Sequence, residues 1–147
     1  MNTLQHFFTF QLAENWLALE PDAIVTILDP QQFIPFPLAP SHILGLIPHG
    51  QSILPVFHLA YFLKMSNADD EDPTQKRLLV LRKNTLEVVV PIQTTGGMKA
   101  IPKESIITSS LVTKNGRLQD FLVGEYESER HVTGILDIGL ILERARV

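Results

Sequence analysis

The sequence contains no cysteine, and its first 63 residues contain neither lysine nor arginine. The missing cysteines exclude disulfides, thiolate-bound zinc and cysteine nucleophiles. Residues 1–73 carry one basic and eight acidic side chains, whereas residues 74–147 carry eleven basic and eight acidic ones. Because nucleic-acid binders usually carry a basic surface and the net charge here is −4, we expect no nucleic-acid partner.

Charge of either sign is absent from residues 30–63. This run contains six prolines and two glycines, which would break the backbone hydrogen bonds of a membrane-spanning helix. The first residues also lack the basic region and the long apolar run of a signal peptide. We therefore expect a cytoplasmic protein with no direct membrane insertion. Partners of the front half would be held by apolar contacts and backbone polar groups.

The hydrophobic pattern predicts a mainly β protein that forms one domain over residues 1–147. Phe8, Phe10 and Leu12 alternate with polar residues, and a second strand begins at Trp16. Many short strands separated by turns indicate a β-barrel or sandwich. The expected strands are 8–12, 16–19, 43–47, 52–56, 78–81, 86–92 and 121–126, and the expected turns are 14–15, 48–51, 83–85 and 114–117.

Three short helices are expected. The first, 23–28, follows a proline and an acidic residue that suit a helix start, the second covers 59–65, and the third covers about 137–145. Asp137 near the start of the last helix and arginines near its end complement the helix dipole. Residues 94–97 are expected to form a bend or flexible loop.

No motif for nucleophilic, metal or phosphate chemistry is present. Glu125, Glu127 and Glu129 alternate, and we expect them on an exposed edge or turn, because like charges on a buried strand repel each other. Residues 66–75 contain four consecutive acidic residues without EF-hand spacing, which predicts a solvated loop.

The aromatic side chains are expected in the core: Trp16, Phe33, Phe36, Phe57, Tyr61 and Phe62.

Three histidines, His42, His49 and His58, are separated by 7 and 9 residues, a spacing that matches no metal motif. His49 falls in the turn of the hairpin expected over 43–56. It is either an ordinary exposed turn residue or a recognition residue at the hairpin tip, and the residues alone leave both interpretations open.

A set of collinear segments resembles the CheW-like domain family. It begins with Phe8-Thr9-Phe10-Gln11-Leu12, Trp16-Leu17-Ala18-Leu19 and a short helix. It continues through Pro35 to Leu38, Ala39 to Leu46, and the stretch from Ile47 to Leu59 with its glycine turn and Pro-Val strand end. Val132 to Asp137, followed by a helix, completes a match over nearly the whole chain.

The resemblance implies two packed five-stranded SH3-like β-barrel subdomains with short helices and a C-terminal helix. It also implies a non-catalytic adaptor without cofactor or metal. Its partners would be the cytoplasmic tip of a chemoreceptor and the regulatory domain of a chemotaxis histidine kinase. By resemblance, Thr26, Leu46, Ile47, His49 and Gly50 would face the receptor, whereas the kinase-facing residues stay unassigned.

The chain departs from the family pattern at three places. His49 stands where the turn typically carries arginine, Thr26 stands near a typical glutamate, and His58 replaces the aspartate after Pro-Val. The glutamate–arginine ion pair of many members therefore cannot form, and losing both partners costs less than leaving one charge unpaired. These changes suggest a specialised array, such as one that controls pilus-driven motility.

Two other functions remain open. One is a small-ligand or metal-binding β-barrel regulator with His42, His49 and His58 around a pocket. The other is a degenerate CheW-like regulator that docks a different signalling protein.

Overall fold

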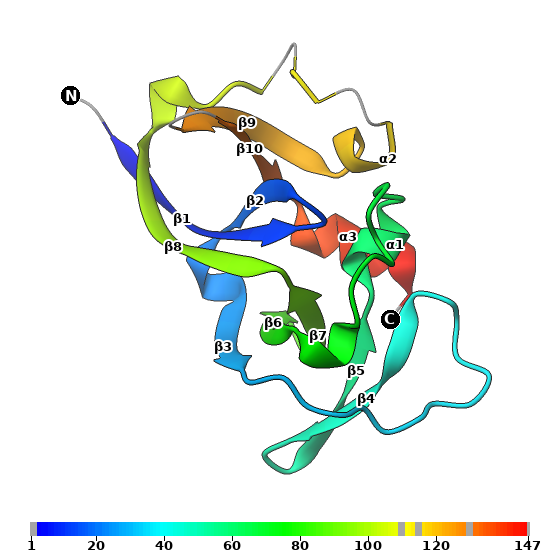
Figure 1. The fold of residues 1–147 in the computed structure, drawn as a ribbon. Coiled ribbons are helices and arrows are strands. Elements are labelled where there is room, and N and C mark those ends of the chain that lie inside the picture. The colour runs from blue at the N-terminus through cyan, green and yellow to red at the C-terminus, as the bar shows by residue number, and fades with distance from the viewer. Residues whose placement is uncertain (1–2, 109–110, 114–115, 129–130, 147) are drawn as a thin grey trace.

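The computed structural model describes residues 3–108, 111–113, 116–128 and 131–146. Within these residues the chain forms ten strands in two five-stranded sheets, with short helices beside them (Figure 1). The mainly β fold class expected from the sequence is thereby confirmed. None of the described helices is long and apolar enough to cross a lipid bilayer.

The first sheet has the order β8-β1-β2-β10-β9. Its β2 and β10 pair in parallel, and its other neighbours pair antiparallel. The first strand was expected from its alternating pattern, and the parallel pair joins segments from opposite ends of the chain. The strands of this sheet are β1 (Leu4–Leu12), β2 (Asn15–Leu19), β8 (Thr94–Pro102), β9 (Leu122–Ser128) and β10 (His131–Leu136).

The second sheet has the order β3-β6-β7-β5-β4. It contains two antiparallel hairpins, β4–β5 and β6–β7, which a parallel pair between β5 and β7 joins. Both hairpins lie where the sequence predicts them. The strands of this sheet are β3 (Ile24–Leu28), β4 (Ile43–His49), β5 (Ser52–Phe57), β6 (Arg77–Lys83) and β7 (Leu86–Ile92).

One isolated bridge links the two edges of each sheet. Ile34, beyond edge strand β3, bridges Leu46 of edge strand β4, and Ile107, beyond β8, bridges Glu125 of β9. Each sheet is therefore curved so that its two edges approach each other at this bridge. The continuous pairing between strands is still that of an open five-stranded sheet.

The helices are short. The last one, α3, starts after Asp137, whose carboxylate accepts a hydrogen bond from the Leu140 amide at 3.1 Å. This confirms the C-terminal helix and its acidic start. The helical segments are η1 (Pro21–Ala23), α1 (Leu59–Phe62), η2 (Pro73–Gln75), η3 (Lys103–Ser105), α2 (Gly116–Gln119) and α3 (Ile138–Ala145).

The largest apolar cluster lies between the two sheets. It includes Phe10 of β1, Leu79 of β6, Val90 of β7 and Ile141 of α3, all fully buried. Smaller clusters lie within each sheet, around Tyr126 in the first and around residues of β4 to β7 in the second. The two sheets are held together mainly by burial of apolar surface.

Three local expectations were wrong. Residues 24–28 form strand β3, because Ile24, Val25, Thr26 and Ile27 are β-branched and the strand pairs with β6 through a register shift at Val25. Residues 94–97 begin strand β8, which pairs along β1 through a register shift. Gly116 begins α2, so no hairpin follows there, and the other part of that expected turn, residues 114–115, lies outside the described residues.

Candidate functional site

The β4–β5 hairpin carries four of the five residues that the family resemblance assigns to receptor binding. Its antiparallel pairing runs from Ile43 opposite Phe57 to His49 opposite Ser52, and Gly50 lies in the two-residue turn. Gly50 has a φ of 60°, a left-handed conformation that favours glycine. The hairpin end therefore presents an exposed Gly50 and a half-buried His49.

The two faces of this hairpin have different roles. Ile47 points inward and is fully buried in the cluster of the second sheet. Side chains alternate along a strand, so Leu46 and Pro48 share the outer face with their cross-strand partners Pro55 and Ile53. The Ile47 side chain stabilises the core, and its neighbours form the apolar surface that a partner can touch.

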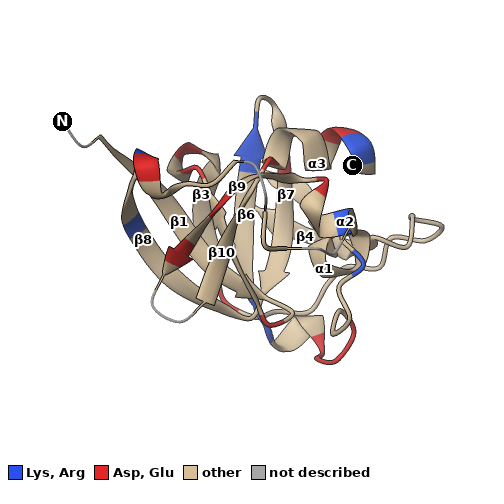
Figure 2. Ribbon diagram, turned by 90° about the horizontal axis from the view of Figure 1, so that it is seen from above, with Lys and Arg blue, Asp and Glu red and all other residues tan. Residues whose placement is uncertain are grey.

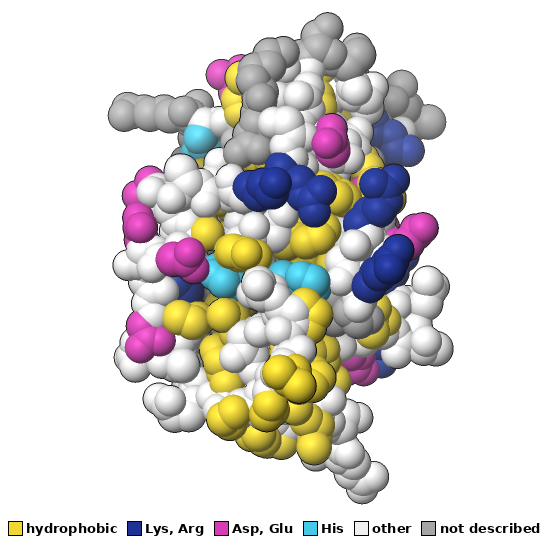
Figure 3. Space-filling model, turned by 90° about the vertical axis from the view of Figure 1, so that its right-hand side faces the viewer, with side chains coloured by type: hydrophobic (Ala, Val, Ile, Leu, Met, Phe, Trp, Pro, Cys, Tyr) yellow, Lys and Arg dark blue, Asp and Glu magenta, His cyan; other side chains and the backbone are white. Residues whose placement is uncertain are grey.

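The loop before the hairpin extends this outer surface. Ile34 exchanges backbone hydrogen bonds of 2.7 and 2.8 Å with Leu46, which attaches the loop to β4. Phe36 is about half exposed and Leu38 is fully exposed. We call Ile34, Phe36, Leu38, Leu46 and Ile53 the apolar ridge. Hydrophobic side chains gather on the lower part of the face in Figure 3, where this loop and the hairpin lie.

A glycine allows the loop to approach the hairpin closely. A Cβ on Gly45 would lie 2.8 Å from the Ile34 carbonyl oxygen and 2.8 Å from the Cβ of Phe33. Gly45 also has a φ of 155°, which other residues rarely adopt. The attachment of the apolar ridge to β4 therefore depends on this residue.

The segment that carries the apolar ridge has no charged side chain, since residues 30–63 contain none and β4 is uncoloured in Figure 2. Contiguous exposed apolar side chains on a soluble protein mark an interaction site. The expectation that Phe36 and Tyr61 belong to the core was wrong, because both are about half exposed. The signal that indicates this surface in the sequence is the proline-rich, charge-free run itself.

Thr26 lies on the same sheet but on its other edge strand. It pairs with Val80 of β6 and is half-buried. A helix was expected at this position, but the residues form strand β3. In the order of hydrogen-bonded strands, Thr26 lies on one edge strand of the sheet and His49 on the other. The structure thus groups Leu46, Ile47, His49 and Gly50 in one hairpin and places Thr26 on the other edge strand, whose end the Ile34–Leu46 bridge brings to β4.

The three histidines of the ligand-binding alternative do not converge. The His58 amide donates to the His42 carbonyl at 2.7 Å, so these two are neighbours. His49 lies at the far end of β4, roughly 20 Å from His42 by strand rise. The His58 ring nitrogen Nε2 lies 3.1 Å from an Asp69 carboxylate oxygen. Among the described residues, no group of three or more His, Asp or Glu side chains is placed to hold a metal ion.

The acidic loop forms a local turn. The Asp72 carboxylate accepts hydrogen bonds from the Thr74 hydroxyl at 2.8 Å and the Thr74 amide at 2.9 Å. These bonds, the hydroxyl first, hold the pKa of Asp72 below its ordinary value. This carboxylate is occupied in ordering the start of η2.

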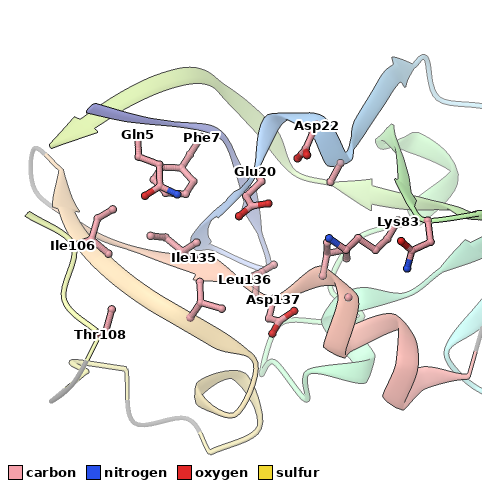
Figure 4. Close-up of a pocket in the computed structure, with 15 residues that line it drawn as sticks. Gln5, Phe7, Glu20, Asp22, Lys83, Ile106, Thr108, Ile135, Leu136 and Asp137 are labelled. Atoms are coloured by element: carbon pink, nitrogen blue, oxygen red, sulfur yellow. The ribbon is translucent and has the colours of Figure 1, made fainter. Parts of the chain in front are cut away.

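A cleft of about 580 Å³ lies between the sheets on another side of the molecule (Figure 4). Glu20, Asp22, Lys83 and Asp137 contribute charged groups to it. Asp137 is engaged as the cap of α3, and Lys83 runs past Gly139 at the start of that helix. In the described part of this cleft, no hydrogen bond joins a nucleophile to a base.

Glu125 is the one buried carboxylate of the described chain, with 2% of its surface exposed. Its oxygens accept hydrogen bonds from the Val112 amide at 2.6 Å, the Thr113 amide at 3.2 Å and the Thr113 hydroxyl. The expectation of an exposed position is wrong for Glu125 because these donors replace its water. Glu127 is exposed as expected, and Glu129 lies outside the described residues.

Comparison with known proteins identifies relatives along almost the whole chain. A family model described as the CheW-like domain matches residues 6–146. Protein FrzA of Myxococcus xanthus is 25% identical over 142 residues, which cover 97% of this chain and 88% of that protein. The solved structure of the scaffolding protein TtCheW from Thermoanaerobacter tengcongensis has a TM-score of 0.81 and 17% identity, and the match covers 96% of this chain and 94% of that one.

Proposed function

This chain belongs to the CheW-like domain family, and from that premise we propose that it couples chemoreceptors to a chemotaxis-type histidine kinase. Members of this family are scaffolds without catalytic activity, and this chain is not an enzyme. The finer proposal is a cytoplasmic adaptor whose residues 1–147 act as one domain, since one apolar cluster takes side chains from both sheets.

The apolar ridge is the observation that carries the proposal. The receptor tip would lie against Leu46 and Ile53, beside His49 and Gly50 at the hairpin end. Such a contact buries apolar surface and needs no ion pair, which fits the absence of the usual arginine and glutamate at His49 and Thr26. A helical receptor tip supplies the amphipathic face that such a surface takes.

The adaptor mechanism needs a second contact with the regulatory domain of the kinase. Strand ends and turns of the first sheet are the proposed place for it. Holding two partners on one body makes the second association effectively intramolecular, so the assembly is tighter than either contact alone. The absence of the charge pair supports the further proposal that the array is a specialised one, such as one for pilus-driven motility.

The test uses the full chain with a purified chemoreceptor cytoplasmic fragment and a histidine kinase from the same genome. Leu38→Ser combined with Phe36→Ser should weaken receptor capture about tenfold or more, since each exposed apolar anchor contributes a kcal/mol or more when covered. His49→Glu should also weaken capture. Both proteins should keep the thermal midpoint of the parent, because the altered side chains lie at the surface.

Met98→Ser is the matched control, because Met98 is exposed to a similar extent on β8 of the other sheet. It should leave receptor capture unchanged. Equal capture by all variants would remove the apolar ridge from the receptor interface. Failure of the wild-type chain to capture either receptor or kinase would contradict the adaptor role itself.

A further inference from the structure

A second, smaller cavity lies against the concave side of the first sheet, away from the apolar ridge. It has a volume of about 220 Å³, and all five strands of that sheet contribute to its lining. The residues that matter here are Thr9, Trp16, Lys99, Tyr126, His131 and Thr133. One water needs far less room than this, so the cavity can take an organic molecule of several non-hydrogen atoms.

The lining is unusually polar for the interior of a sheet. The described chain buries three polar or charged side chains, and two of them, Thr9 and Thr133, line this cavity. The Thr9 hydroxyl donates to the Gly97 carbonyl at 3.0 Å, which leaves its oxygen able to accept. Apolar packing alone does not account for two buried threonines that face one cavity.

Tyr126 supplies the observation that points to a ligand. Its side chain is 1% exposed, and its hydroxyl has no hydrogen-bond partner in good geometry among the described residues. The ring is held by stacking against Phe7, with centroids 6.0 Å apart. Burial raises the pKa of Tyr126, and the nearby Thr133 hydroxyl offsets part of that shift. The phenol is fixed and has less than 1 Å² of its hydroxyl accessible, so a ligand that accepts from this donor must displace the side chains beside it.

The charged and aromatic side chains that line the cavity indicate which class of ligand it can bind. Lys99 and His131 line it, and none of the described lining residues is an aspartate or a glutamate. Trp16 stacks on His131 with centroids 4.9 Å apart and forms an aromatic wall. The Lys99 ammonium together with hydroxyl donors matches a carboxylate, and the aromatic wall suits a short carbon chain attached to it.

We propose that this cavity binds a small organic monocarboxylate. The Tyr126 hydroxyl would donate to the carboxylate, Lys99 would neutralise it, and Trp16 would cover the carbon chain. This goes beyond the adaptor function and does not rest on it, because the cavity lies in the first sheet and the apolar ridge lies on the second.

The chain contains a single tryptophan, and it lines the cavity, so its fluorescence reports occupancy directly. Acetate, L-lactate and pyruvate are titrated into the full chain at constant ionic strength and pH 7, with inorganic phosphate and chloride as other anions. We expect a saturable change in Trp16 emission with at least one monocarboxylate, with half-saturation below about 10 mM.

Tyr126→Phe should weaken this binding about tenfold, because it removes one donor to a charged group. Tyr61→Phe is the matched control, since it alters the other tyrosine of the chain, which lies at the surface, and should leave binding unchanged. Lys99→Gln, at an exposed position, should weaken binding without affecting folding.

Thermal unfolding completes the test. Tyr126→Phe should keep or raise the unfolding midpoint of the ligand-free chain, because it removes a buried hydroxyl without a full partner. No saturable signal with any monocarboxylate, an equal response to phosphate and chloride, or unaltered binding in both Tyr126→Phe and Lys99→Gln would each overturn the proposal. A clear fall in the midpoint of Tyr126→Phe would assign the hydroxyl a structural role and overturn it as well.

Discussion

Replacing Glu125 by glutamine tests the most unusual interaction in the chain. The change keeps the size of the side chain but removes its charge and turns one acceptor oxygen into a donor amide. The Val112 amide at 2.6 Å can keep an oxygen acceptor, whereas the Thr113 amide at 3.2 Å then faces another donor. The Thr113 hydroxyl can turn and accept, so the amide of half-buried Thr113 keeps only its longer contact of 3.5 Å to the retained oxygen.

The magnitude follows from these contacts. A hydrogen bond to a charged group contributes about 1.5–3 kcal/mol, and weakening the bond of the half-buried Thr113 amide costs about 1 kcal/mol more. Because the side chains adjust, we expect the free energy of unfolding to fall by about 2–4 kcal/mol. For a chain of this length that lowers the thermal midpoint by roughly 5–12 °C.

Urea unfolding and calorimetry at pH 7 measure the effect. Glu127→Gln is the control, because Glu127 lies two residues along the same strand and is exposed. It should change the free energy of unfolding by less than about 0.5 kcal/mol. If the two variants lose the same stability, or if Glu125→Gln loses less than about 1 kcal/mol, the reasoning on the buried carboxylate is refuted.

Three further outcomes are expected. Ile47→Ala should lower the free energy of unfolding by about 3 kcal/mol in urea titrations, because Ile47 is fully buried. A loss near zero would show that Ile47 is not a core residue and would make it a candidate for the receptor interface. Asp137→Ala should cost about 1 kcal/mol by calorimetry through loss of the α3 cap, and an unchanged midpoint would contradict that role. Burial raises the pKa of Tyr126 in the folded protein, because it favours the neutral phenol. The contribution of this group to the free energy of unfolding is therefore complete below about pH 10 and is lost as pH rises through the folded-state pKa. Unfolding followed from pH 9 upward should show this decline in the wild-type chain and in Tyr61→Phe but less of it in Tyr126→Phe, and equal declines in all three would contradict it.

Local pattern determined several elements correctly. Alternation identifies β1, the glycine turn identifies the β4–β5 hairpin, and an acidic residue at the start with arginines near the end identifies α3. These features depend on neighbours within a few positions, so the sequence alone contains the information. The family resemblance likewise depends on the order of short segments, and the match over residues 6–146 agrees with it.

The candidate site was predicted only in part. The sequence indicated the charge-free run over residues 30–63 and the hairpin that carries His49. It could not separate Ile47, which is buried, from Leu46, which lies on the outer face, because that distinction depends on which side of the hairpin the core lies. The exposure of Phe36 and Leu38 depends on how the loop is attached to β4 by the Ile34 bridge.

Tertiary structure decided the remaining features, because each involves partners far apart in the chain. Residues 24–28 have β-branched side chains that either a strand or a short helix can contain, and pairing with β6 selects the strand. Glu125 is buried because donors 12 and 13 residues away replace its water. The polar cavity around Tyr126 exists because five strands drawn from both ends of the chain curl together, and no local pattern specifies that arrangement.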